Sequence, residues 1–291
     1  MWPSPPSRRT STRSSPRILL TEPTSPVCRN FTRLPMVYSM MTEGLNFLAG
    51  KVAMWMKNRS FVRITLRAQN PTSFTKMKWK IAQYLERRWW KHYLRQKDAA
   101  EYLTDKRQYW QRTLNQLGHS AKAGNASLDA GCGPAGIFIL LHDQERVTAL
   151  DPLLERYATD LDIFSFSGYP KVDFITSPLE TASLPAAGFE TIYCFNAINH
   201  VRDWELALDR LTEWAAPGAT MLISSDVHRR PWLKRIFRLL PGDLLHPQQH
   251  DAEAYHNALV KRDWRIDEKV ILREELIFNY VGWRVVKVGP K

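Results

Sequence analysis

The sequence predicts an α/β protein built on a doubly wound, mostly parallel sheet of seven strands. Three observations predict this fold. Beyond residue 126, short apolar runs alternate with helical segments. A glycine-rich loop follows the first apolar run, and Asp or Asn stands at the end of others. A helical segment precedes the sheet, and a basic tail rich in Ser and Pro precedes that segment.

The expected strands are short apolar runs separated by helices or turns. They cover residues 127–130, 146–150, 172–175, 191–195, 220–224, 269–276 and 282–288. A helix should follow the first strand to about residue 143, and another should cover 204–214. The Ala-Pro-Gly-Ala run at 216–219 predicts the turn into the fifth strand.

The chain divides by composition into three regions. Residues 1–75 form a disordered or weakly ordered basic N-terminal extension, which begins like a transit peptide or an upstream extension. Residues 76–118 form a helical cap, in which Asp98 begins a second helix and Gly118 ends it. Residues 119–291 form the α/β domain.

The net charge of +12 is unevenly distributed. Residues 1–118 hold 22 Lys and Arg against six Asp and Glu, whereas residues 119–291 carry a net −4. A basic arm suits nucleic acid or an anionic membrane surface, but the body has no polyanion-binding signature. The three cysteines form no CxxC, which favours a reducing compartment and argues against a disulfide framework or a cysteine-rich zinc site.

The motif with the clearest chemistry is Gly131, Gly133 and Gly136, a GxGxxG loop between a strand and a helix. Glycine lets the backbone turn tightly and lets a ligand approach the main chain. Asp151 follows at the end of the second strand, where an acid can accept hydrogen bonds from both ribose hydroxyls. These features indicate an adenosine-containing cofactor without separating nicotinamide dinucleotide from S-adenosylmethionine.

A further carboxylate separates these two cofactors. Asp129 stands two residues before the first glycine, where it suits the ammonium of a methionyl group and would repel a pyrophosphate. With this residue, the chain resembles the class I S-adenosylmethionine-dependent methyltransferases, particularly the small-molecule group of the type 11 kind. The stretches that carry the resemblance are 128–133, 147–151, 189–203 and 211–223.

The resemblance implies a Rossmann-like methyltransferase fold, S-adenosyl-L-methionine as cofactor and a set of contacts to it. The implied cofactor-binding residues are Asp129, Gly131, Cys132, Gly133, Asp151, Pro152, Pro178, Leu179 and Asn196. In this set the glycine loop holds the methionyl end, Asp151 the ribose, residues 177–180 bracket the adenine, and Asn196 lines the space near sulfur. The sequence departs from the family pattern at Glu190, in place of Asp, and at Ala219, in place of Gly. Both lie outside the expected pocket.

The acceptor side offers three candidate catalytic residues, His200, Asp226 and His228. A general base is needed only if the acceptor must lose a proton, as a phenol or enol would. His200 would otherwise cap or pack the helix that follows. His246, His250 and His256 suggest a polar lid, an ordinary surface loop or a pair of histidines that binds a metal ion. We expect no metal. Residues 229–240 predict a basic amphipathic helix, with either a solvated face or contact with an anionic substrate or membrane.

The sequence therefore predicts a methyltransferase acting on an O, N or C atom of a small-molecule or lipid-like acceptor. Two alternatives remain: a nucleic-acid methyltransferase, and a catalytically inactive cofactor-binding protein of the same fold. The near-neutral body, and Ala197-Ile198-Asn199 after Asn196 in place of an Asn-Pro-Pro-Tyr tetrad, disfavour the first. We expect a cytoplasmic protein, with peripheral membrane contact through the basic Trp-rich N-terminal helices as an option.

Overall fold

The computed structural model describes residues 71–95, 97–228, 250–274 and 278–289. The chain divides into two units, Met1–Val62 and Arg63–Lys291, and all described residues belong to the second. The expectations for the basic N-terminal extension up to residue 70, for the amphipathic helix over 229–240 and for His246 fall outside the described residues.

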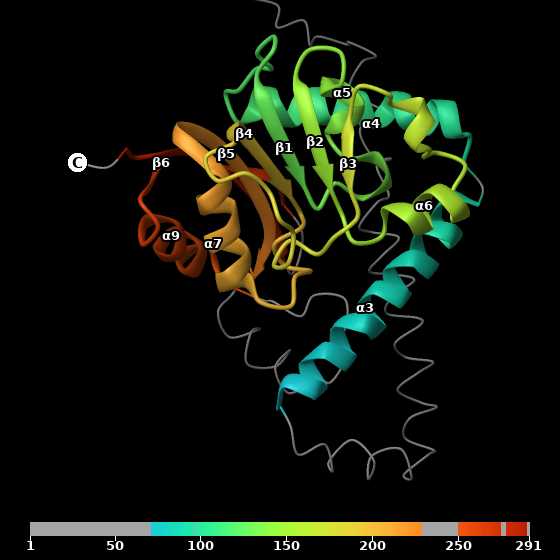
Figure 1. The fold of residues 1–291 in the computed structure, drawn as a ribbon, viewed down its shortest axis with the longest axis horizontal. Coiled ribbons are helices and arrows are strands. Elements are labelled where there is room, and N and C mark those ends of the chain that lie inside the picture. Colours follow the sequence, from blue (N-terminus) through green and yellow to red (C-terminus); the bar gives the residue numbers. More distant parts are fainter. Residues whose placement is uncertain (1–70, 96, 229–249, 275–277, 290–291) are drawn as a thin grey trace, which may run out of the picture. The chain divides into compact units, whose positions relative to one another are not determined.

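A seven-stranded sheet forms the centre of the second unit (Figure 1), in the order β3-β2-β1-β4-β5-β7-β6. The strands are β1 (Ala126–Ala130), β2 (Arg146–Leu150), β3 (Asp173–Ile175), β4 (Phe189–Phe195), β5 (Ala215–His228), β6 (Trp264–Glu274) and β7 (Phe278–Lys287). Strand β7 runs antiparallel to both of its neighbours, β5 and β6, and all the other strand pairs are parallel. The doubly wound, mostly parallel fold predicted from the sequence is therefore confirmed.

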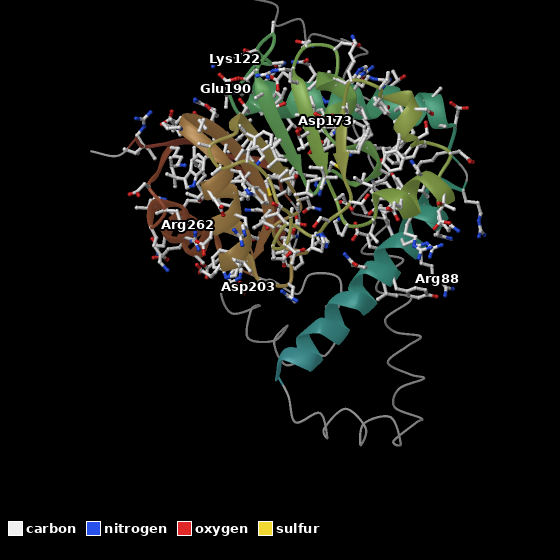
Figure 2. The ribbon with its side chains drawn as sticks, in the orientation of Figure 1. Arg88, Lys122, Asp173, Glu190, Asp203 and Arg262 are labelled. Carbon is white, nitrogen blue, oxygen red and sulfur yellow. The ribbon has the colours of Figure 1, made fainter. Side chains whose placement is uncertain are left out.

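Two helices cover one face of the sheet (Figure 1): α7 (Trp204–Trp214) and α9 (Ala252–Val260). Their apolar sides bury Leu211, Trp214 and Leu259 against Ile192 and Ile223 of the central strands. Asp203 and Asp251 cap these helices by accepting hydrogen bonds from backbone N–H groups in the first turn. Arg262, after α9, joins α9 to α7 through Glu205 and Asp209, both at 2.7 Å (Figure 2).

The other face receives α4 (Ala99–Gln116) and α5 (Phe138–Leu141), with α6 (Leu154–Asp160) near β2 and β3 (Figure 1). Trp110 of α4 stacks on Phe195 of β4, with ring centroids 5.2 Å apart. Asp98 caps α4 by accepting from the N–H of Glu101, and Gly118 follows the helix at a φ of +60°. Both ends of this helix match the sequence expectation.

A longer helix, α3 (Pro71–Leu94), precedes α4 and contacts α6. Arg87 and Lys91 of α3 form ion pairs with Asp160, and Glu86 accepts a hydrogen bond from the Tyr157 hydroxyl. The helical segment ahead of the sheet thus begins five residues earlier than predicted. Among the described residues, no helix is long and apolar enough to cross a membrane.

The later strands and α9 differ most from the sequence expectation. Strand β5 already begins at Ala215 and includes the predicted turn, because Gly218, at a φ of +74°, and an irregularity in the pairing with β4 absorb it. The segment considered as a lid or surface loop contributes α9, whose Tyr255 is fully buried. The apolar side of α9 packs into the core. The histidines gave this segment a polar composition, so the sequence did not indicate a buried helix.

Charged residues lie at both ends of the parallel strands. Lys122 and Glu190 lie where β1 and β4 begin, and the Glu190 carboxylate accepts a hydrogen bond from the N–H of Ala126 (Figure 2). Asp203 lies towards the opposite end, where these parallel strands finish (Figure 2). The departure from the family pattern at Glu190 is therefore at the amino end of the strands, whereas the glycine loop follows the carboxyl end of β1.

Candidate functional site

The glycine loop is held at the carboxyl end of β1 by its neighbours. The Leu150 carbonyl oxygen accepts hydrogen bonds from the N–H groups of Gly131, at 2.7 Å, and Cys132, at 3.1 Å. Gly131 has a φ of +72°, and a Cβ built on it would lie 2.3 Å from the Cβ of Ala197. Glycine is therefore required at this position by backbone conformation and by space. Cys132 is buried beneath the loop.

Gly133 has a similar backbone but different surroundings. Its φ is +58°, yet a Cβ built on it would meet nothing within 4 Å. The N–H of Gly133 donates to Oδ2 of Asp151 at 3.0 Å, and Gly133 begins a short 3-10 helix (Gly133–Ala135). The space above Gly133 is therefore open, and a ligand can approach the main chain of the loop there.

Asp129 points into the loop, as expected, and is 3% exposed. Its Oδ2 accepts a hydrogen bond from the N–H of Phe138 at 3.0 Å, and a Cβ on Gly136 would lie 2.4 Å from that oxygen. Burial, reinforced by the nearby charge of Asp151, raises the pKa of Asp129 to about 7. The carboxylate thus organises the loop as well as giving the site negative charge.

Asp151 stands at the end of β2 beside the loop. Its two oxygens accept from the N–H groups of Gly133, at 3.0 Å, and Leu153, at 2.8 Å. Burial raises its pKa to about 6. A carboxylate has about four acceptor sites in all, so Asp151 retains the capacity to accept from two hydroxyls. Pro152, the next residue, is half-buried.

The segment after β3 divides into a surface part and a structural part. Pro178 is half-exposed, whereas Leu179 is buried in the core on the α7 side of the sheet. Glu180 is also buried, and its Oε1 accepts from the N–H groups of Arg202, at 2.7 Å, and Asp203, at 3.1 Å. The segment expected to bracket adenine therefore also ties the loop after β4 to the sheet.

Asn196, at the end of β4, has the left-handed backbone that Asn tolerates best after Gly. Its N–H donates to the backbone oxygen and to Oγ of Ser224, both at 3.1 Å, and its side chain is exposed. Asn199 donates to Oδ1 of Asn196 at 3.4 Å and keeps a buried Oδ1 without a partner among the described residues. Asn196 thus presents its amide beside the loop, while Asn199 supports it.

Helices α3, α4 and α6 supply residues near the loop that were not among the predicted site residues. The Trp110 indole N–H donates to the Ala135 carbonyl oxygen at 3.1 Å, so α4 contacts the glycine loop directly. Tyr157 of α6 is fully buried, and Trp90 of α3 packs against it with ring centroids 6.5 Å apart. Only the Trp-rich composition of residues 76–118 indicated these contacts in advance.

The three candidate catalytic residues lie at the carboxyl ends of β4 and β5, as predicted. Asp226 is half-buried near the end of β5, and His228 is the last residue of that strand. His200 is half-buried in the turn after β4, and its N–H donates to the Ala197 carbonyl oxygen at 2.9 Å. The His228 side chain falls outside the described residues.

The histidines before and on α9 have separate surroundings. The His250 ring stacks on Trp204 at 3.7 Å between centroids, whereas His256 is exposed on α9. Within the described ranges, no group of three or more His, Cys, Asp or Glu side chains is arranged to hold a metal ion.

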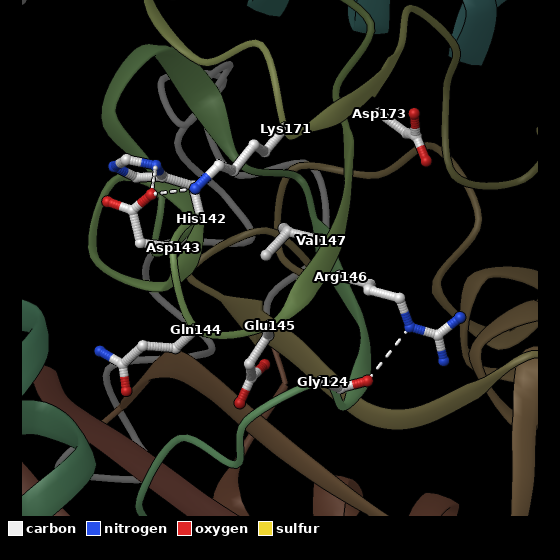
Figure 3. A pocket seen from close by; sticks show the side chains of 9 residues that line it. All are labelled: Gly124, His142, Asp143, Gln144, Glu145, Arg146, Val147, Lys171 and Asp173. Carbon is white, nitrogen blue, oxygen red and sulfur yellow. Dashed lines mark hydrogen bonds and ion pairs between the residues drawn. The ribbon is translucent and has the colours of Figure 1, made fainter.

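A separate cleft of about 370 Å³ opens at the amino end of the parallel strands, around the start of β2 (Figure 3). Lys171 forms an ion pair with Asp143 on its rim at 2.9 Å, and the Arg146 guanidinium donates to the Gly124 carbonyl oxygen at 3.1 Å (Figure 3). Ligands of open α/β sheets bind beyond the carboxyl ends of the strands, where the strand order reverses. Here that place lies between β1 and β4, so we assign the functional site to the glycine loop and not to this cleft.

Comparison with known proteins gives a consistent result. The methyltransferase-domain family matches residues 102–269. An uncharacterized methyltransferase of Mycobacterium tuberculosis is 33% identical over 104 residues, which are 34% of this chain and 50% of that protein. The chain thus spans about half the length of the curated relatives it matches.

Solved structures share the fold at low sequence identity. The YcgJ protein of Bacillus subtilis has a TM-score of 0.50 and 12% identity, covering 63% of this chain and 99% of that one. A Bacillus halodurans protein has a TM-score of 0.51 and 10% identity, covering 62% and 98%. These likenesses support the fold assignment alone.

Proposed function

The chain belongs to the methyltransferase-domain family, as the sequence resemblance predicted, and on that premise we propose that it methylates a small-molecule acceptor with S-adenosylmethionine. The observation that carries the proposal is the open space above Gly133, next to Asp151 at the carboxyl ends of β1 and β2. Backbone can be approached closely there, and hydrogen-bond acceptors lie beside it.

The residues present fit this cofactor. Asp151 would accept from ribose hydroxyls, and the exposed Asn196 side chain would line the space near sulfur. Asp129 and Asp151 are both buried carboxylates with raised pKa values, so a cationic ligand close to them would relieve an unfavourable concentration of negative charge. A pyrophosphate would add to that charge, which argues against a dinucleotide.

When bound, S-adenosylmethionine supplies a methyl group already activated on a sulfonium. The protein therefore has mainly to align the acceptor atom with that methyl and to exclude water, an effect worth roughly 7–11 kcal/mol in favourable cases. Stacked Trp110 and Phe195 supply an apolar boundary next to the loop, and α3 packs on α6. Asp226, His200 and His228 are the residues to test as proton acceptors if the acceptor is a phenol or enol.

The alternatives predict different behaviour. A nucleic-acid methyltransferase would bind RNA or DNA with a steep salt dependence, since affinity would come largely from phosphate contacts. A catalytically inactive relative would bind the cofactor without turnover. The intact glycine loop and Asp151 favour cofactor binding in both the active and the inactive protein, so turnover has to be measured separately.

The first experiment is calorimetric titration with S-adenosylhomocysteine, the stable product. We expect the wild-type protein to bind it and Gly133→Ala to weaken binding by at least about tenfold, because the new Cβ fills the ligand's approach. Gly218→Ala is the matched control: its φ is +74°, its Cβ meets nothing within 4 Å, and it lies outside the site, so its affinity should equal wild type. A wild-type protein that binds neither this product nor S-adenosylmethionine would disprove the proposal.

The second experiment measures turnover. Metabolite extract is incubated with the protein and S-adenosylmethionine carrying a 13C-labelled methyl group, and mass spectrometry searches for compounds that gain one labelled methyl. Gly133→Ala provides the background. Cofactor binding without any labelled product would identify the inactive binding protein instead.

A further inference from the structure

A second group of polar side chains lies on the α4 side of the sheet, over the strands that extend away from β1 and β2. Strand register places Asp226 of β5 opposite Tyr280 of β7, and Tyr280 opposite Arg273 of β6. Cross-strand partners point to the same face of a sheet, so these three residues form one row. In sheet order the row begins next to β4, whose end carries Asn196.

Helix α4 adds a lysine and a tyrosine to this row. Lys106 is 9% exposed, and its Nζ lies 4.7 Å from the ring centroid of Tyr109 and 4.7 Å from that of Trp110. Tyr109 shares a hydrogen bond with Tyr280, and Arg273 lies over the Tyr280 ring at 5.6 Å. Two cations therefore lie against aromatic rings in a largely buried place.

The electrostatics of Lys106 are those of a cation that a negative ligand would stabilise. Burial, and then the charge of Arg273, lower the pKa of Lys106 to about 8, and Asp129 opposes this only in part. Asp226 lies in the row beside the two cations, and burial still outweighs the nearby negative charge of Asp129 in its effect on the Lys106 pKa. A bound anion would favour the charged lysine and offset its desolvation.

The surroundings also favour a flat ligand. Trp110 stacks on Phe195, and its indole is fixed by the Ala135 carbonyl oxygen, so one wall is a rigid ring next to the glycine loop. The Tyr280 hydroxyl is fixed 2.5 Å from Oγ of the buried Ser224. Rings held this way stack on planar molecules at low entropic cost.

We propose that Lys106 and Arg273 form the anion-binding end of the acceptor site, and that the acceptor is a planar, ring-bearing molecule with a carboxylate group. This inference rests on the proposed function and deepens it. The row lies beside β4 on the side away from the cofactor loop, so a ring between the two would have its carboxylate at Lys106 and Arg273 and its other end towards the loop.

The test uses the full protein saturated with S-adenosylhomocysteine and pairs of probes that differ in charge: benzoate with benzamide, 4-hydroxybenzoate with 4-hydroxybenzamide, and 2-naphthoate with 2-naphthamide. Binding is measured by ligand-observed NMR and calorimetry. We expect at least one acid to bind about tenfold or more tightly than its amide. Lys106→Met and Arg273→Met should each remove that preference. Their controls, Lys97→Met and Arg265→Met, change one cation over Tyr93 and one exposed ion pair and should retain it.

Affinities for S-adenosylhomocysteine and for its decarboxylated analogue show whether Lys106 binds the carboxylate of the acceptor or that of the cofactor. Under the proposal Lys106→Met changes both affinities by the same factor, and the binding that remains shows that the variant is folded. If Lys106→Met weakens only the carboxylate-bearing compound, Lys106 holds the cofactor and the proposal is overturned. Equal binding of every acid and its amide overturns it too. Failure of the wild-type protein to bind S-adenosylhomocysteine would instead contradict the proposed function.

Discussion

Replacing Gly131 with alanine should destabilise the fold much more than the same change at Gly218, which has a similar backbone but open space around it. The left-handed backbone costs alanine about 1–2 kcal/mol. The new Cβ would also lie 2.3 Å from the Cβ of Ala197, whose Cα is only 3.5 Å away, so backbone must move. Overpacking of this kind costs about 1–3 kcal/mol, and the stiffer unfolded chain returns about 0.4–1 kcal/mol. The expected loss is therefore roughly 2–4 kcal/mol.

Thermal and urea unfolding of Gly131→Ala and Gly218→Ala measure this difference. Gly218 has a φ of +74° and open space around its Cβ, so it experiences the backbone strain without the clash. At roughly 2–4 °C per kcal/mol for a domain of this size, Gly131→Ala should melt about 4–16 °C below wild type and Gly218→Ala only a few degrees below. Equal melting temperatures for the two variants would refute the close contact between the loop and Ala197.

Three further predictions concern charge and the N-terminal helices. Because the folded pKa of Asp129 is about 7, above its ordinary 3.8, the folded apoprotein binds more protons than the unfolded chain between these values, and its stability should fall as pH rises through that window. Melting curves from pH 4.5 to 8.5 should show this slope, and Asp129→Asn should reduce it; a slope unchanged in the variant would assign it to other groups. Trp110→Phe should cost about 1 kcal/mol and weaken S-adenosylhomocysteine binding, because the Ala135 carbonyl loses its donor; unaltered affinity would show that α4 does not support the loop. Asp160→Ala should speed hydrogen exchange in α3, whose Arg87 and Lys91 lose their ion pairs, with little change in the melting temperature; unchanged exchange would show that these ion pairs do not hold α3.

The sheet and the glycine loop were predictable because their signals are local. The strands are compact apolar runs, and the loop's glycines and Asp151 lie within about 20 residues of one another. Resemblance to a family then supplied the cofactor. Asp129 was correctly expected to point into the loop, but its burial and its hydrogen bond to Phe138 depend on how α5 packs, which no local pattern encodes.

The row on the acceptor side could not be predicted for the opposite reason. Lys106, Asp226 and the neighbouring pair Arg273 and Tyr280 come from parts of the chain far apart in the sequence, and strand register brings the last three together. In the sequence, Lys106 is one of many basic residues on a Trp-rich segment. Helix α9 was missed for a similar reason. Its sequence is largely polar, and its apolar side becomes a core element only by packing against β5, β7 and α7.

The two buried carboxylates beside the loop have a consequence for the release of product. Methyl transfer converts a sulfonium into a thioether, so the spent cofactor carries one positive charge fewer than the fresh one. Under the proposed function, Asp129 and Asp151 would attract that lost charge, and their burial would leave it little screened by water or salt. Such a site would favour the loaded cofactor over the spent one by electrostatics, which would oppose inhibition by its own product.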